Sequence, residues 1–395
     1  MGVPDRDLDP GLSRSAPSPY VYPSALKRFS ARLLDAAGDF WLAPAPRPID
    51  WKESQRIAVL RLDHLGDLLH AFPALKALRQ SLPKAHIDLL VGPWGKEIAE
   101  LCPFVDRVLV CDAPWFQRPQ RVAWPWAAIQ ALAETLRRGD YDLGLELRGD
   151  LRHHLALWLA GVPHRAGQAV TAGRFLLTHP ARYRPGLHEV EQNLSLLEQS
   201  GLDLKKSAKD ASGLLKIPAF AVSEAAKVSR ALKLKPGFVA IQAACGTPAK
   251  RWMPEHWAAL IAGLPKGLPL VLLGSESERE EMLAIAGRLG SGTPVKVAAG
   301  LLTLSGLAAF LKKAKLLISV DSGPAHLAAA LGTPVLALYS ATNRPEQWGL
   351  RGAHTRMLRS DVPCSPCELS VCPYDNECMR RIRVASALKA AGAML

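Results

Sequence analysis

Several side chains that could do chemistry lie just after apolar runs that predict buried strands. They are Gly66 and Asp67 after the run at 56–62, Lys250 and Arg251 after 238–243, Glu276 after 270–273, and Asp321, Ser322, Gly323 and His326 after 316–320. The carboxyl ends of parallel strands form the ligand-binding edge of an open α/β sheet. The pattern therefore predicts one polar site built from several strand-to-helix turns.

The turn at 321–326 has the features of a phosphate-binding site. Pro324 suits the first turn of a helix, where its missing N–H costs nothing, and the sequence Gly-Thr-Pro at 332–334 ends that helix. The free N–H groups of a helix N-terminus attract phosphate, and His326 is close enough in sequence to reach the same point. On this local pattern, an ordinary strand–helix crossover with a polar turn is the alternative.

The other candidates each have a chemical role and a plainer structural one. The carboxylate of Asp67 could remove a proton from a hydroxyl group, or it could cap the helix that follows. The cations of Lys250 and Arg251 could neutralise a departing diphosphate, or they could belong to a solvated loop. Glu276 could accept hydrogen bonds from a ribose, or it could cap a helix.

Strand and helix patterns alternate along the chain, which predicts two doubly wound parallel sheets. Strands are expected at 56–62, 86–91, 107–111 and 141–147, and again at 238–243, 270–273, 295–298, 316–320 and 335–339. We expect an N-terminal extension at 1–50, Rossmann-like domains at 51–205 and 206–380 joined by a polar linker at 201–218, and a C-terminal helix at 381–395. The insertion at 113–126, rich in Trp, Pro and Arg, interrupts the first domain.

The N-terminal extension combines a tail with a helix. The tail, to about residue 22, is rich in Pro and Ser and is expected to be disordered. The segment 25–41 predicts an amphipathic helix, in which one side carries Leu26, Phe29, Leu33 and Ala37 and is flanked by Lys27, Arg28 and Arg32. The apolar side of this helix could touch a membrane surface, or it could pack on the first domain.

Composition limits the partners and the compartment. The chain has 395 residues and a net charge of +13, from 49 Lys and Arg against 36 Asp and Glu, which suits anionic partners. The sequence contains no run of five or more basic residues, so a tail that binds nucleic acid is not expected. Neither a signal peptide nor an apolar run of ~18 residues is present. A cytoplasmic protein with reduced cysteines is expected.

Several familiar motifs are absent. The sequence contains no GxGxxG and no GxxxxGK[ST], which argues against dinucleotide and P-loop sites. Asp-x-Asp pairs occur only at 5–9 and 140–142, outside the predicted ligand turns, so no catalytic metal is expected. Four thiols near the C-terminus could bind a structural zinc ion, or they could be plain reduced thiols; they are Cys364, Cys367, Cys372 and Cys378.

The chain resembles glycosyltransferase family 9, the heptosyltransferase-like enzymes, over roughly residues 55–385. The matching stretches are RIAVLRLDHLGDLLHAFPALKALR, LRGDLRHHLALWLAGVPHRAG, AKRWMPEHW, SVDSGPAHLAAALGTPVLALYSAT and the cysteine-rich end. The resemblance implies a GT-B fold, in which two Rossmann-like domains face a central cleft. It also implies an inverting, metal-independent transfer of a sugar from a nucleotide donor, ADP-heptose in the best-known members, to a lipopolysaccharide-type acceptor.

The resemblance also implies roles for particular residues. Asp67 matches the general base and Lys250 matches the cation that stabilises the leaving phosphate. The donor would bind at Arg251, Glu276 and the turn formed by Asp321, Ser322, Gly323 and His326, with Gly66, Arg152, His153 and His154 on the acceptor side. An anionic glycolipid acceptor on the cytoplasmic leaflet would suit the net charge and a peripheral contact with the inner membrane.

Two alternatives remain at this point. A nucleotide-sugar epimerase could use the same two-domain fold and would need no acceptor. A non-catalytic sugar-nucleotide-binding protein would tolerate the loss of Asp67. For a transferase, Asp67 and the turn at 321–326 lie on different domains, so the two domains must come together around donor and acceptor.

Overall fold

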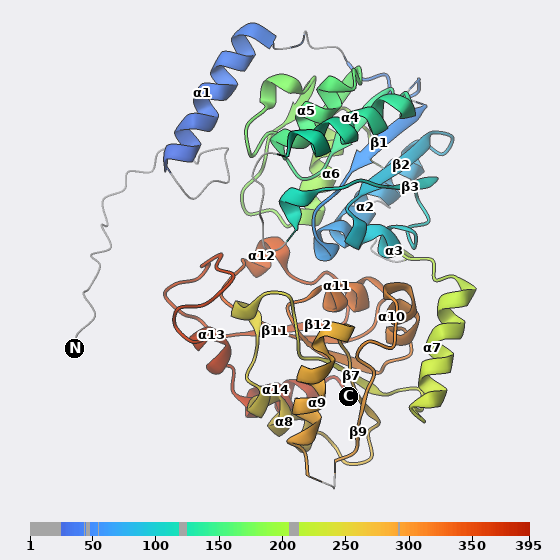
Figure 1. Ribbon diagram of the computed structural model, residues 1–395, viewed down its shortest axis with the longest axis vertical. Helices are drawn as coiled ribbons and strands as arrows, with labels where there is room; N and C mark the ends of the chain where they lie inside the picture. Colours follow the sequence, from blue (N-terminus) through green and yellow to red (C-terminus); the bar gives the residue numbers. More distant parts are fainter. Residues whose placement is uncertain are drawn as a thin grey trace, which may run out of the picture.

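The computed structural model describes residues 25–42, 44, 48–53, 55–117, 125–204, 213–290 and 293–395. Two α/β domains follow one another along the long axis of the molecule (Figure 1). The tail predicted to be disordered, the middle of the insertion at 113–126 and the centre of the linker at 201–218 lie outside the described residues. Within the described ranges, no helix is both long and apolar enough to cross a membrane.

The N-terminal domain is built on a six-stranded parallel sheet with the order β3-β2-β1-β4-β5-β6. Its strands are β1 (Arg56–Leu60), β2 (His86–Val91), β3 (Arg107–Val110), β4 (Leu143–Glu146), β5 (His164–Gln168) and β6 (His179–Ala181). Its α-helices are α2 (Leu65–Ser81), α3 (Lys96–Ala99), α4 (Trp126–Gly139), α5 (Leu151–Leu159) and α6 (Glu189–Gln199). Short 3-10 turns are η1 (Pro93–Gly95), η2 (Pro114–Phe116) and η3 (Arg174–Leu176), and α1 (Ala25–Leu42) precedes the sheet.

The C-terminal domain repeats this plan with the order β12-β11-β10-β7-β8-β9, also parallel throughout. Its strands are β7 (Val239–Gln242), β8 (Leu270–Leu272), β9 (Val295–Val297), β10 (Leu316–Val320), β11 (Val335–Tyr339) and β12 (Thr355–Arg359). Its helices are α7 (Ala219–Ala231), α8 (Pro254–Gly263), α9 (Arg279–Gly287), α10 (Leu304–Leu311), α11 (Gly323–Ala330), α12 (Pro345–Trp348), α13 (Glu377–Arg380) and α14 (Val384–Gly392), with the 3-10 turns η5 (Pro248–Lys250) and η6 (Glu276–Glu278).

The alternation of β1 shows how both faces of a sheet are covered. Ile57 and Val59 belong to the core cluster that includes Phe72 of α2. Ala58 and Leu60, which point the other way, belong to the cluster of α4 and α5. Successive side chains of a strand point to opposite faces, so a strand that is apolar at every position needs helices on both sides. The two predicted doubly wound sheets are therefore confirmed.

Three strands differ from the expectation. The structure adds β5, β6 and β12, which the sequence pattern did not predict. Helix α2 begins at Leu65 and continues through Pro73, which lies about two turns into it. The C-terminal helix is observed as α14, and it packs on α8, where Leu388 lies against Gly263.

Candidate active site

In each sheet, the direction in which the chain adds strands reverses once, between β1 and β4 and between β7 and β10. Ligands of doubly wound folds bind outside the carboxyl ends of the strands at this point. The turns there line one cavity of about 1160 Å³ between the two domains. Of the predicted site residues, the cavity is lined by Gly66, Asp67, Lys250, Glu276, Asp321, Ser322, Gly323 and His326.

The N-termini of α2 and α11 approach each other closely across the cavity. A methyl group at Gly66 would lie 3.1 Å from Cδ2 of His326, and one at Gly323 would lie 2.7 Å from Cδ2 of Leu65. Glycine at both positions therefore permits the close approach. It also places Asp67, in the first turn of α2, across the cavity from the turn that begins α11.

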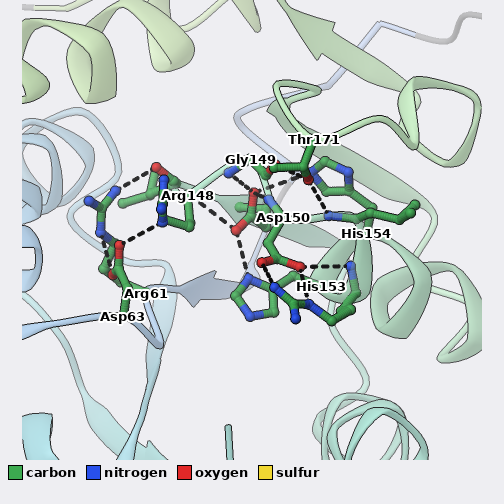
Figure 2. Close-up of polar contacts among 12 residues, drawn as sticks. Arg61, Asp63, Arg148, Gly149, Asp150, His153, His154 and Thr171 are labelled. Atoms are coloured by element: carbon green, nitrogen blue, oxygen red, sulfur yellow. Dashed lines mark hydrogen bonds and ion pairs between the residues drawn. The ribbon is translucent and has the colours of Figure 1, made fainter. Parts of the chain in front are cut away.

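Asp67 contacts a group of charges centred on the buried Arg61 and Asp63, which Figure 2 shows with Arg148. The guanidinium of Arg61 contacts Asp63 (Nε to Oδ1, 2.9 Å), Glu189 (Nη1 to Oε1, 2.9 Å) and Asp67 (Nη2 to Oδ1, 3.8 Å). Arg148 contacts the other side of Asp63 (Nε to Oδ2, 3.2 Å). Asp67 is the member of these carboxylates that reaches the cavity, with 21 % of its side chain exposed.

The charge states in this group follow from burial and mutual contact. Burial raises the pKa of Asp63 to about 7, although Arg61 and Arg148 act in the opposite direction. Burial also raises the pKa of Glu189 against the pull of Arg61. For Arg61, burial disfavours the charge, but Asp63 and Glu189 outweigh it and raise the pKa above its usual value. Arg61 is therefore a fixed positive charge beneath the Asp67 carboxylate.

The second charged group of the cavity belongs to the C-terminal domain. Asp321, which follows β10, accepts a hydrogen bond from Lys250 Nζ at 2.5 Å and one from Asn343 Nδ2 at 3.3 Å. His326 Nε2 lies 3.5 Å from its other oxygen. Burial opposes ionisation of Asp321, but His326 and Lys250 outweigh it and lower the pKa to about 2. Asp321 thus holds the ammonium group of Lys250 and the imidazole of His326 at the N-terminus of α11.

The structural alternatives for Asp67 and Glu276 as helix caps are wrong. The N-cap residue of α2 is His64, and Asp67 lies in the first turn. At η6 a capping box formed by Ser275 and Glu278 satisfies the helix start. Glu276 lies against Gly300, whose added Cβ would meet its Oε2 at 1.7 Å, and it lines the cavity.

Comparison with known proteins identifies the family. Residues 129–377 match the model of glycosyltransferase family 9 (heptosyltransferase), which is more than half of the chain. The chain belongs to glycosyltransferase family 9. Lipopolysaccharide heptosyltransferase 1 of Pseudomonas aeruginosa is 29% identical over 338 residues, covering 81% of this chain and 88% of that protein. Lipopolysaccharide heptosyltransferase 3 of Escherichia coli K12 is 29% identical over 295 residues, covering 70% of this chain and 80% of that protein.

Solved structures agree on the fold of this glycosyltransferase. A family 9 glycosyltransferase from Veillonella parvula superimposes with a TM-score of 0.72 at 24% identity, covering 88% of this chain and 98% of that one. The ADP-heptose heptosyltransferase II of E. coli gives 0.68 at 21% identity, covering 86% and 98%. The predicted GT-B fold, with two Rossmann-like domains around a cleft, is confirmed.

Two basic side chains lie elsewhere in the glycosyltransferase than the resemblance implied. Arg251 was expected beside the donor, but it is not among the residues that line the cavity, and it pairs with Glu281 at 3.6 Å. Arg152 was expected on the acceptor side. It donates from Nε and Nη2 to Asp150 at 2.8 and 2.5 Å, and its guanidinium lies 5.1 Å from the ring centroid of Trp115. These contacts hold both arginines away from the cavity.

His153 and His154 are wrong as acceptor-facing residues. Both side chains are fully buried, and His153 Nδ1 lies 2.8 Å from Glu146 Oε1 while His154 Nε2 lies 3.2 Å from Oε2 (Figure 2). Consecutive residues of a helix point in different directions, and here each histidine reaches a different oxygen of one carboxylate. The pair fastens α5 to the end of β4 and does not line the cavity.

Zinc binding at the cysteine-rich end of the glycosyltransferase stays a prediction. Cys364 is exposed, whereas Cys378 is buried and its Sγ accepts a hydrogen bond from the N–H of Ala341 at 3.3 Å. Burial raises the pKa of Cys378 in the metal-free protein. Across the described ranges, no group of three or more His, Cys, Asp or Glu side chains is arranged to hold a metal ion.

The sequence interpretation missed the four residues behind Asp67. Arg61, Asp63 and Arg148 come directly after β1 and β4, and Glu189 begins α6. A signal was available for Arg61, because a charge that ends an apolar strand is buried and needs a partner. The partners themselves become neighbours only because β1 pairs with β4 in the folded sheet.

Proposed function

We propose that this glycosyltransferase transfers heptose from ADP-heptose to a lipopolysaccharide-type glycolipid at the cytoplasmic face of the membrane, with inversion and without a metal. One observation carries the proposal. Asp67 of the N-terminal domain and the Lys250–Asp321 ion pair of the C-terminal domain line the same cavity. The names of the relatives, lipopolysaccharide heptosyltransferases 1 and 3, support the donor and acceptor classes.

In the proposed reaction, Asp67 removes the proton of an acceptor hydroxyl while its oxygen attacks the anomeric carbon of the donor. The new bond joins that carbon to the acceptor oxygen, and the bond to the diphosphate oxygen breaks on the opposite face, so the configuration inverts. Asp67 lies beside the fixed charge of Arg61, which orients its carboxylate. General base catalysis of this kind contributes ~10²–10⁴-fold to a rate.

The leaving nucleoside diphosphate carries the negative charge that develops in the transition state. We assign the stabilisation of this charge to Lys250, which lines the cavity, and to the N–H of Gly323 at the start of α11. Because Asp321 is itself an anion, we assign it the task of holding Lys250 and His326 rather than contacting phosphate. Glu276 would accept hydrogen bonds from the ribose. With a side-chain cation in place, no step needs a metal ion.

Arg148 gives the acceptor side of the cavity a positive charge. Its side chain is 37 % exposed and lines the cavity near Asp67, while its Nε is held by the buried Asp63. A guanidinium that is fixed at one end and open at the other suits an anionic group such as a phosphate. This arrangement favours an anionic glycolipid over a neutral acceptor.

The first test separates chemistry from binding by changing Asp67→Asn. The amide keeps the shape of the side chain but cannot take a proton, so we expect turnover to fall by ~10²–10⁴-fold, while calorimetry shows unchanged affinity for ADP-heptose. Asp203→Asn, at an exposed carboxylate outside the cavity, is the matched control. Turnover retained by the Asp67→Asn protein would show that Asp67 is not the base.

A second test addresses the donor and the metal. We expect calorimetric titration with ADP-heptose to give a saturable signal that GDP-, UDP- and dTDP-sugars do not match. Transfer is expected to be unchanged after treatment with EDTA, because Lys250 supplies the cationic charge at the phosphates. A preference for another nucleotide would overturn the donor assignment, and a loss of transfer that Mg²⁺ restores would overturn the metal-independent mechanism.

A further inference from the structure

Helix α1 is attached to the N-terminal domain by its small and polar face. The buried side chains of this helix are Ala31 and Asp35, together with the backbone at Gly38. Asp35 Oδ1 accepts hydrogen bonds from the N–H groups of Gly173 at 2.7 Å and Arg174 at 3.0 Å, at the start of η3. Asp39 pairs with the Arg174 side chain, and an added Cβ at Gly38 would meet the Phe175 ring at 2.2 Å. The helix is thus held on η3 at close range.

The opposite face of α1 is apolar and exposed. At about 100° per residue, Leu26, Phe29, Leu33, Ala37 and Phe40 fall within a stripe about 80° wide on the side away from η3. We call these five residues the apolar stripe. Leu26, Phe29, Leu33 and Phe40, with the adjacent Trp41, are each between 56 % and 80 % exposed. A helix that packs on a globular domain normally buries such a stripe, and α1 does the reverse.

The charges of α1 are divided between the same two faces. Both of its acidic residues, Asp35 and Asp39, are used in the contact with η3. The exposed Lys27 and Arg32 lie on either flank of the apolar stripe. The outward side of the helix therefore presents large apolar side chains and positive charges, without an acidic side chain of its own.

We propose that the apolar stripe of α1 binds the surface of an anionic lipid bilayer, with the helix lying in the plane of the interface. Apolar side chains that enter the headgroup region, with cations beside them, are the features by which amphipathic helices bind such surfaces. A second copy of this chain would gain nothing from Lys27 and Arg32, because the same cations would face it. This inference rests on α1 alone and not on the proposed sugar transfer.

The position of α1 also relates the bilayer to the cavity. The turn that carries η3 follows β5, just as the turn of Asp67 follows β1. In a parallel sheet both turns lie at the carboxyl edge. Thr171, between β5 and η3, accepts a hydrogen bond from Leu151 N and donates one to the carbonyl of Gly149, the residue after Arg148 (Figure 2). The bilayer would therefore meet the N-terminal domain at the edge that bears its half of the cavity.

The test is co-sedimentation of the full chain with vesicles of phosphatidylcholine, alone and mixed with phosphatidylglycerol. We expect binding to the mixed vesicles that weakens with added salt, and binding at least several-fold weaker to phosphatidylcholine alone. The double variant Phe29→Ser/Leu33→Ser should lose about ten-fold or more in affinity, because two large apolar contacts are removed. Phe220→Ser, at a 65 % exposed phenylalanine on α7, is the matched control and should bind as the wild type does.

A second variant tests the positive charges of α1. The variant Lys27→Glu/Arg32→Glu leaves the apolar stripe intact and should lose binding to the mixed vesicles, which gives a second readout if the serine variant does not fold. Transfer to an acceptor in free solution should be the same in all these proteins. The proposal is overturned if the wild type does not bind mixed vesicles or if the stripe variants bind them as well as the wild type. It is also overturned if light scattering shows a wild-type dimer that the serine variant dissociates, since the stripe would then bind a second copy.

Discussion

Arg61 shows how much of the site depends on one buried side chain. Its guanidinium is fully buried, and it contacts two buried carboxylates, those of Asp63 and Glu189, as well as Asp67 at the cavity. Its Nη1 also donates to the carbonyl of Leu147 at the end of β4. A buried ion pair that loses one partner leaves an uncompensated charge, so Arg61 has a structural role as well as an electrostatic one.

The first prediction concerns the substitution Arg61→Met. We expect the free energy of unfolding to fall by ~3–5 kcal/mol, because Asp63 and Glu189 would be left buried without their main counter-charge. The measurement is equilibrium unfolding in urea. Arg138→Met on α4 removes an exposed pair with Glu134 and is the matched control, with a much smaller expected change because solvent screens exposed pairs. Equal losses in the two variants would contradict the structural role of Arg61.

At this scale the sequence predicts residues that stand at strand ends, and it fails for residues whose neighbours are set by the fold. The sequence predicted that Asp67, Lys250, Asp321 and His326 share one site because each follows an apolar strand, and all four line the cavity. His153 was misassigned because its position in a polar stretch says nothing about Glu146, which turns it inward. The separation of two residues in the sequence does not show which side chains a buried carboxylate will contact.

The connection between β4 and α5 is organised around the carboxylate of Glu146. It accepts hydrogen bonds from the N–H groups of Arg148 at 3.1 Å and Asp150 at 3.2 Å, and it contacts the rings of His153 and His154. Burial opposes its ionisation, but the two histidines outweigh burial and hold the pKa of Glu146 well below its usual value. This single side chain therefore sets the turn that carries Arg148 into the cavity.

Replacing the carboxylate of Glu146 by an amide tests whether it stabilises the connection between β4 and α5. We expect Glu146→Gln to lower the free energy of unfolding by ~3 kcal/mol, because hydrogen bonds to a buried charge are lost. Since the pKa is depressed in the folded state, the stabilisation is present above the unfolded value of 4.5 and is lost as the pH falls below it. Urea unfolding at neutral and acidic pH should show the two proteins converging at low pH. Glu134→Gln on the surface of α4 is the control, and a pH-independent difference would contradict this account.

The strands divide into those that the sequence pattern predicts and those that it does not. Apolar runs such as LLISV in β10 were predicted, whereas β5 (HRAGQ), β6 (HPA) and β12 (TRMLR) were not. Arg165 in β5 is buried because its guanidinium donates to the carbonyls of Val162 and Leu176. Such partners lie in the folded loops, so hydropathy alone cannot indicate that a strand with arginine is internal.

The two domains are joined by contacts of several kinds on one side of the cavity. One apolar cluster runs from α2 and α6 of the first domain into α10 and α11 of the second. The ring of His70 lies 4.9 Å from His188 and 4.8 Å from His326, and His188 Nε2 donates to the carbonyl of Gly349 at 2.8 Å. The interface therefore holds imidazoles from both domains close together.

These histidines predict a pH dependence for the whole molecule. Burial lowers the pKa of His188 from 6.5 to about 4, against the hydrogen bond to Gly349, and burial together with His326 lowers the pKa of His70. The folded state thus binds fewer protons than the unfolded chain, so stability is complete above pH 6.5 and declines as the pH falls towards 4. Arg351 and Glu191 also face His188, with opposite effects on its charge.

The measurement is the free energy of unfolding across that pH range. Each depressed histidine contributes up to ~1.4 kcal/mol per pH unit between its two pKa values. The variant His188→Gln should show a shallower decline than the wild type, whereas His354→Gln, at an exposed histidine, should not change the slope. An identical slope for wild type and His188→Gln would show that the interface does not exclude the proton.

The division of the charged groups between the two sheets has a consequence for the fate of the donor. In the proposed reaction, the cation that helps the diphosphate to leave belongs to the C-terminal domain, and the only assigned base belongs to the N-terminal one. The carboxylates that the C-terminal domain brings to the cavity have other tasks in this scheme, because Asp321 holds Lys250 and His326 and Glu276 accepts hydrogen bonds from the ribose. Hydrolysis of the nucleotide sugar by water would then be slow as long as no acceptor is bound between the domains.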